Sequence, residues 1–176
     1  ATGSATVFES AASENIAITF DSNLNKIVIA FRDTGNSNYG TAIVGTVSSN
    51  SISFGTAVVF ESAATESIAA TFDTNSNKVV LCYKDSGNSS RGTSIVGTVS
   101  GTGISFGSAV VFDTSTASDL SATFDTDTNK VIFAYQQGGT NTGRAVVGAV
   151  SGTNISFGST VAFDSAGGGW ISVTYD

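Results

Sequence analysis

A repeat of about 52 residues runs through the whole chain and constrains its fold more than any other feature. Four equivalent aromatic residues mark the repeat at spacings of 52, 52 and 51 residues: Phe20, Phe72, Phe124 and Tyr175. Self-similarity at such a period indicates an array of similar structural units. We predict one array with full repeats at about 15–66, 67–118 and 119–169, and with partial copies at 1–14 and 170–176.

Each repeat contains four strand-like runs, which in the second repeat are 67–72, 78–84, 93–99 and 104–112. A turn rich in Asp, Asn and Ser joins the first two runs, which is typical of a β-hairpin. The run 78–84 is apolar on both faces, which predicts a strand in the middle of a layered structure. Gly107 interrupts the fourth run and predicts a bulge or bend.

Four antiparallel strands per repeat of this length predict an all-β fold, a β-propeller-like array of four-stranded blades. A β-trefoil is the alternative, because it also contains three units of four strands. Three units and a fraction do not close as a conventional propeller monomer, so the chain is expected to be part of a longer propeller or to share a ring with a second copy. The matching sequence at the two chain ends favours the propeller, which uses such an overlap to complete one blade from both ends.

The repeat also resembles that of the sialidase-type (BNR or Asp-box) β-propellers. Residues 67–85, SIAATFDTNSNKVVLCYKD, are similar to the inner strand pair of those blades, and residues 96–112, VGTVSGTGISFGSAVVF, to the outer hairpin. Gly103 or Asn154 stands where that family has its Asp-box aspartate, and Phe106 stands near its Trp. The resemblance implies the fold without the sialidase activity. It extends to repeat arrays of phage tail-fibre-like and bacterial surface proteins.

Composition excludes several classes of partner. Seven basic and fourteen acidic residues give a net charge of −7, which disfavours nucleic acid and anionic membranes. No apolar run approaches the roughly 18 residues of a membrane span. Cys82 is the only cysteine and is expected to be a buried apolar residue.

The polar loops that follow the second and fourth strands of each repeat are the expected ligand-binding face, because binding residues sit on loops of a rigid scaffold. Arginines, acidic and amide groups and aromatic rings on this face suit a sugar. The candidate residues are Arg32, Asp33, Tyr39, Lys84, Asp85, Arg91, Gln136, Gln137, Arg144 and Trp170. A solvated rim with weak ion pairs is the alternative for these loops. Trp170 aligns approximately with Ile16, Ile68 and Leu120, which favours a core position over a stacking platform.

The turn between the first two strands is a second candidate site. Asp21, Asp73 and Asp125 each begin an Asp-x-Asn/Asp-x-Asn motif that matches the opening of a calcium loop. Lys follows where that loop needs Gly, and Asx residues form such turns without metal. No metal and no cofactor is therefore predicted, and calcium at Asp21, Asp73 and Asp125 is the alternative.

The sequence favours a protein that is not an enzyme. It contains no His, which excludes a Ser-His-Asp triad and a His-based zinc site. Its arginines occupy different positions within the repeat, so they are not expected to converge into the arginine cluster that a sialidase active site needs. The predicted function is a lectin-like recognition module of an extracellular or virion-associated repeat protein, which binds a glycan or a cell surface. The alternative is a structural, self-assembling repeat of a fibre or surface layer, so a homo-oligomer or a longer chain is expected.

Overall fold

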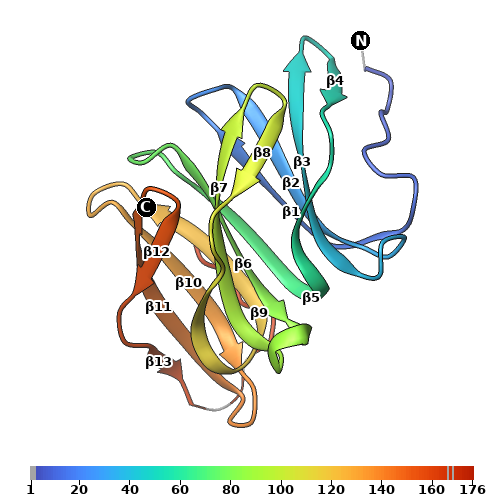
Figure 1. Ribbon diagram of the computed structural model, residues 1–176. Coiled ribbons are helices and arrows are strands. Elements are labelled where there is room, and N and C mark those ends of the chain that lie inside the picture. Colours follow the sequence, from blue (N-terminus) through green and yellow to red (C-terminus); the bar gives the residue numbers. More distant parts are fainter. Residues whose placement is uncertain (1–2, 166, 168) are drawn as a thin grey trace.

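The computed structural model describes residues 3–165, 167 and 169–176, whose strands form successive antiparallel sheets (Figure 1). The first sheet consists of β1 (Ser13–Asp21), β2 (Lys26–Asp33), β3 (Tyr39–Ser48), β4 (Ser51–Phe54) and the start of β5 (Val58–Asp73). The second consists of the end of β5, β6 (Lys78–Asp85), β7 (Arg91–Ser100), β8 (Gly103–Phe106) and the start of β9 (Val110–Asp125). The third consists of the end of β9, β10 (Lys130–Gln137), β11 (Thr142–Ser151), β12 (Asn154–Phe157) and β13 (Val161–Asp164).

Each sheet therefore has four strand positions. The fourth, outermost position is shared by two segments, a short strand such as β8 and the beginning of the strand that follows it, such as β9. This pairing confirms the four-stranded antiparallel units predicted from the repeat. It excludes the β-trefoil alternative, because each unit forms a sheet of its own. A single-turn 3₁₀ helix, η1 (Ser86–Asn88), lies in the loop after β6.

The second strand of the middle sheet is buried on both faces, as its apolar sequence predicts. In β6, residues 79–83 are fully buried. Val79, Leu81 and Tyr83 pack against the first sheet, while Val80 and Cys82 pack against the third. The sheets are thus stacked face to face, and the side chains between them form the core.

The hairpin turns are stabilised by their aspartates. The Asp73 carboxylate accepts hydrogen bonds from the backbone N–H groups of Asn75 and Ser76 at 2.9 and 3.0 Å. Asn77 closes the turn in the left-handed region, at φ 55°. Asp21 and Asp125 make equivalent bonds in the other two repeats.

The fourth strand-like run is divided in two, as its internal glycine predicts. Gly107 follows the end of β8, and its N–H donates to the Val96 carbonyl at 2.9 Å. The chain then continues into β9, which pairs with the other half of β7.

The prediction of a variable loop between the fourth strand of one repeat and the first strand of the next is wrong. In the two places where the next sheet is present, β5 and β9 run through this region without a break. The backbone stays extended because both neighbouring sheets supply pairing partners: Glu61 pairs with Gly40 of β3, and Thr65 pairs with Asp85 of β6. One strand thus belongs to two sheets.

The two chain ends do not complete one sheet together, contrary to the expectation from their matching sequences. The stacked sheets form an open array, and the N-terminal segment lies at one end of it, where Phe8 packs on Phe31 at 5.2 Å between ring centroids. The C-terminal segment lies at the other end, where the Val173 N–H donates to the Ser121 hydroxyl at 3.1 Å. The array does not turn far enough to bring the ends together (Figure 1).

Candidate functional site

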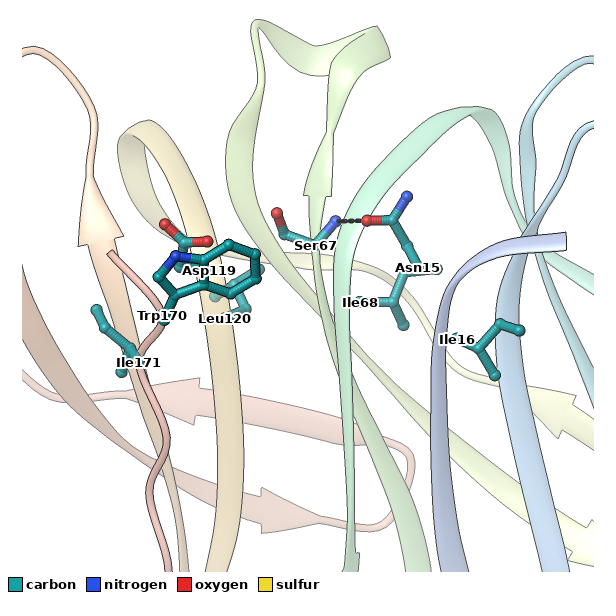
Figure 2. Close-up of a pocket in the computed structure, with 8 residues that line it drawn as sticks. All are labelled: Asn15, Ile16, Ser67, Ile68, Asp119, Leu120, Trp170 and Ile171. Atoms are coloured by element: carbon teal, nitrogen blue, oxygen red, sulfur yellow. Dashed lines mark hydrogen bonds between the residues drawn. The ribbon is translucent and has the colours of Figure 1, made fainter. Parts of the chain in front are cut away.

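The first strand of each repeat, or the segment equivalent to it, is called its innermost segment here: β1, the end of β5, the end of β9 and residues 170–176. These four segments converge on one pocket of about 250 Å³ (Figure 2). Two consecutive residues from each segment line it, and these pairs recur with the sequence repeat. They are Asn15 and Ile16, Ser67 and Ile68, Asp119 and Leu120, and Trp170 and Ile171. The pocket therefore arises from the repeat itself and lies where the four innermost segments come together.

A β-bulge directs one residue of each innermost strand toward the pocket. Residues 15–16 lie opposite the single residue Phe31, and residues 67–68 lie opposite Tyr83. The first residue of each bulge is in the left-handed region, with φ of 50° at Asn15, 48° at Ser67 and 49° at Asp119. Such bulges re-aim side chains and are over-represented near binding sites. Trp170 has the same conformation, at φ 63°.

The structure corrects the alignment of Trp170. Its equivalents are Asn15, Ser67 and Asp119, whereas the buried Ile68 corresponds to Ile171. The interpretation of Trp170 as a core residue is therefore wrong: its side chain is 96% exposed. Figure 2 shows the indole beside Asp119 and Leu120 at the edge of the pocket.

A hydrogen bond links two of the bulges. The Ser67 N–H donates to the Asn15 side-chain oxygen at 3.0 Å, across exactly one repeat (Figure 2). This bond holds the first two innermost strands in register at the pocket. The pocket thus combines one large exposed ring, one carboxylate, an amide and a hydroxyl.

Two of the predicted loop residues form an ion-pair chain that connects the first two sheets. Arg32 lies 3.4 Å from Glu14 and 4.0 Å from Glu66, and Lys84 lies 2.8 Å from Glu66. The lysine hydrogen bond and charge lower the pKa of Glu66. These charged groups are engaged with one another and do not line the pocket.

Two further predicted residues stabilise their own loops. The buried Asp33 carboxylate accepts from the N–H groups of Gly35 and Asn36, at 3.0 and 3.1 Å. The buried Asp85 carboxylate accepts from the Asn88 N–H at 3.1 Å and caps η1.

The remaining predicted residues lie apart from one another. Tyr39 is half-buried where β3 meets β5. Arg91 donates to Asn88, and its Nε is buried without a hydrogen-bond partner. Arg144 donates to Thr142 and Thr160, while Gln137 donates to Asp113 and Ser115. The Gln136 side-chain oxygen accepts from Ser118. Of the predicted residues, Trp170 is the one that lines the pocket.

Acidic residues also connect consecutive sheets. The Tyr83 hydroxyl donates to Glu61 at 3.1 Å, and Tyr135 donates to Asp113, its equivalent one repeat later, at 2.7 Å. Burial raises the pKa of Glu61, and the negative charge of Asp85 raises it further. Burial also raises the pKa of Tyr83, which keeps its hydroxyl a donor.

The turn aspartates do not gather metal ligands. Within the described residues, no three His, Cys, Asp or Glu side chains form a group that could hold a metal ion. The Asp21, Asp73 and Asp125 carboxylates bind their own turn backbone instead. Cys82 is buried, as predicted, and burial raises the pKa of its thiol. Among the described residues there is also no helix with the length and apolar character needed to cross a membrane.

No protein-family model and no curated protein matches the sequence. The fold is similar to that of an exo-β-1,3-galactanase from Phanerochaete chrysosporium, whose crystal structure was determined with β-1,3-galactotriose. The TM-score is 0.54 over 88% of this chain, at 10% identity. The chain spans 36% of the length of the galactanase chain. Because that enzyme has a five-bladed β-propeller fold, the likeness supports a propeller-type arrangement of sheets.

This likeness contradicts the prediction that the chain is not an enzyme. The galactanase is a glycoside hydrolase, so sheets of this arrangement do carry hydrolytic activity in another protein. The absence of histidine was a weak basis for the prediction, because glycoside hydrolysis uses carboxylates. At 10% identity the likeness shows the fold alone and transfers no residue role.

Proposed function

We propose that the chain binds a carbohydrate in the pocket lined by Trp170 and Asp119. The observation that carries the proposal is the position of Trp170, an almost fully exposed indole at a polar pocket where the innermost segments converge. A single exposed ring is common on protein surfaces, so it is the place of this ring beside polar groups at a pocket that favours a ligand. Its flat face suits the C–H face of a sugar, and the polar groups beside it suit the hydroxyls.

The propeller-type fold supports the same ligand class. The galactanase binds a β-1,3-linked galactose oligosaccharide, so galacto-oligosaccharides are the first ligands to test. In this proposal the array is part of a propeller ring that further units complete. A place on an extracellular or virion surface, where glycans are the usual targets, stays a prediction.

Tryptophan fluorescence tests the proposal directly, because Trp170 is the only tryptophan in the chain. Titration with a panel of galacto- and gluco-oligosaccharides is expected to shift the emission to shorter wavelength and to reduce quenching by iodide. Calorimetry then gives the Kd. Trp170→Ala is expected to weaken binding at least about tenfold, which corresponds to about 1.4 kcal/mol.

Tyr39→Ala is the matched control, because it removes another aromatic ring at the start of β3, next to the loop between the second and third strands and outside the pocket. It is expected to leave the Kd unchanged. Loss of binding in Tyr39→Ala with full binding in Trp170→Ala would move the site to that loop. An unchanged emission spectrum with every sugar of the panel would refute carbohydrate binding at this pocket.

Hydrolysis of the bound glycan is a second candidate function, favoured by the likeness to the galactanase. Glycoside hydrolases use two carboxyl groups about 5 to 10 Å apart. Asp119 is the one carboxylate among the described residues that line the pocket, so a second must come from outside this lining. Incubation with the oligosaccharides that bind should release reducing ends at a rate that Asp119→Asn abolishes. Unchanged sugars after prolonged incubation would leave binding as the function.

A further inference from the structure

The outer face of the third sheet is a partly filled version of the interfaces inside the array, because the C-terminal segment, and not a complete sheet, lies beside it. The face that each of the first two sheets turns toward the next sheet is buried. In the second sheet this face comprises Val80, Cys82, Ser94, Val96 and Phe112. The equivalent residues of the third sheet are Ile132, Ala134, Ala145, Val147 and Phe163. Here Val147 is 48% exposed and Phe163 is 59% exposed, because no sheet follows.

Phe163 already has the conformation that this interface requires. Its ring lies over Gly143, where a Cβ atom would approach it to 2.6 Å, just as the ring of Phe112 lies over Gly92 at 2.5 Å. Inside the array, the ring of Phe112 also packs on Tyr135 of the next sheet at 5.2 Å. Beside Phe163, a mainly apolar cavity of about 450 Å³ lies between this face and the C-terminal segment, with Ile132, Ala134 and Ala145 on one side and residues 169–173 on the other.

The complementary face exists at the other end of the array. Phe31 in β2 is the equivalent of Tyr83 and Tyr135, the rings that pack against Phe60 and Phe112. The innermost strand of the first sheet exposes Ile16, Ile18 and Phe20, whereas their equivalents in the second sheet are packed in the core. Phe20 is 53% exposed, while Phe72 is 7% exposed.

The N-terminal segment covers part of this complementary face. Phe8 is the equivalent of Phe60 and Phe112, and it packs on Phe31 at 5.2 Å and on Phe54 at 6.0 Å. Phe60 makes the same two contacts inside the array, with Tyr83 at 5.2 Å and with Phe106 at 5.7 Å. Phe8 thus stands in for the aromatic residue of a preceding sheet.

We propose that the chain associates head to tail with a second copy of itself, with the third sheet of one copy packing on the first sheet of the other. Phe163 of one copy replaces Phe8 on Phe31 of the next, and the displaced N-terminal segment is the competitor at that face. Residues 169–173 compete in the same way at the third sheet, where they lie beside the cavity that β1 of the next copy would fill. The occupant is a second copy because both faces repeat an interface that this sequence forms twice within one chain. Such a heterologous interface builds a ring if its rotation closes and a filament if it does not.

The mass of the full chain in solution, measured by light scattering or sedimentation over a wide concentration range, tests this association. The mass is expected to rise with concentration above the 17.7 kDa of one chain. Phe163→Ser is expected to keep the protein at the mass of one chain throughout. Phe8→Ser is expected to move association to at least about tenfold lower concentration, because it removes the competitor at the first sheet.

Neighbouring positions provide matched controls. Val7→Ser alters an exposed residue beside Phe8, and Ala162→Ser alters one beside Phe163, and neither is expected to change the association. Hydrogen exchange of the unmodified chain gives a measurement independent of any variant: protection at β1 and β13 should increase with concentration. A single-chain mass at all concentrations for both the unmodified chain and Phe8→Ser would overturn the proposal, as would unchanged association of Phe163→Ser.

Discussion

At the scale of single residues, equivalent positions of the repeat carry different chemistry. Tyr83 and Tyr135 donate to acidic residues of the preceding long strand, whereas Phe31 at the same position has no hydroxyl. Glu9, the equivalent of Glu61, instead accepts from the Ala11 N–H. The packing therefore accepts either phenylalanine or tyrosine at this position. The hydrogen bond from the tyrosine hydroxyl to an acidic side chain is present in the second and third repeats and has no counterpart in the first.

The raised pKa of Glu61 predicts a specific pH dependence of stability. A carboxyl group with a raised pKa in the folded state contributes stability that is complete below its unfolded pKa, near 4.5, and lost as pH rises through the folded value. Glu61→Gln keeps an acceptor for Tyr83 without the charge. We expect the unmodified chain to lose more free energy of unfolding than Glu61→Gln between pH 4 and pH 7. Parallel profiles in urea denaturation would show that Glu61 does not titrate abnormally.

The exposed Trp170 is difficult to place from the sequence. The pattern WISVTYD identifies an innermost segment, but its alignment depends on a spacing that shortens from 52 to 51 residues. A shift by one residue changes a strand position from one face to the other. The sequence alone therefore places Trp170 at the position that Ile171 occupies, the equivalent of the buried Ile68. The left-handed conformation of Trp170 and its equivalents leaves no signal in residue type, because Asn, Ser, Asp and Trp all adopt it there.

At the scale of elements, the repeated glycine at the start of the third strand makes room for an aromatic ring. Added Cβ atoms at Gly40 and Gly92 would approach Phe60 and Phe112 to 2.5 Å, so a larger residue has no space there. The ring of the outermost strand thus reaches across its own sheet to the next one. This contact explains why a glycine stands near the start of an otherwise well-ordered strand.

Gly92→Ala is expected to destabilise the protein by about 1 to 3 kcal/mol, the usual cost of overpacking a core. Gly103→Ala is the matched control, because the nearest atom to an added Cβ there is a backbone oxygen at 3.7 Å. It should change the free energy of unfolding by less than about 0.5 kcal/mol. Urea denaturation of both variants measures the difference. Equal stabilities would mean that Phe112 moves aside without cost.

The regular elements could be predicted because period-2 alternation and Asx turns are local signals. The four strands, the doubly buried second strand and the turn at Asp73 all follow from residues that touch within one hairpin. The link between sheets could not be predicted in this way. A run such as ESAATES is polar and variable, which is typical of a loop, and it stays extended because two separate sheets pair with it.

At the scale of the whole molecule, burial is uneven along the array. The second sheet is covered on both faces, while the first and third each have one face that no complete sheet covers. Backbone amides are protected in proportion to the stability of the region that must open to expose them. The array should therefore be most stable in its middle.

Hydrogen exchange followed by mass spectrometry is expected to show this gradient at low protein concentration. Amides of β6 and β7 should exchange slowest, and those of β13 and of residues 170–176 fastest, because the latter segments have few packed neighbours. The prediction concerns the isolated chain, so it is made at a concentration below any association. Exchange in β13 as slow as in β6 would contradict it.

The sharing of β5 and β9 between neighbouring sheets also determines how a gene of this kind can grow or shrink. No loop separates one unit from the next, because β5 and β9 each belong to two sheets. If the chain is divided at any point of its 52-residue period, each of the two new ends therefore carries half of one connection between sheets. Duplicating or deleting one period rejoins those halves without a new linker. Chain length can therefore change by whole units while every remaining joint between sheets stays identical.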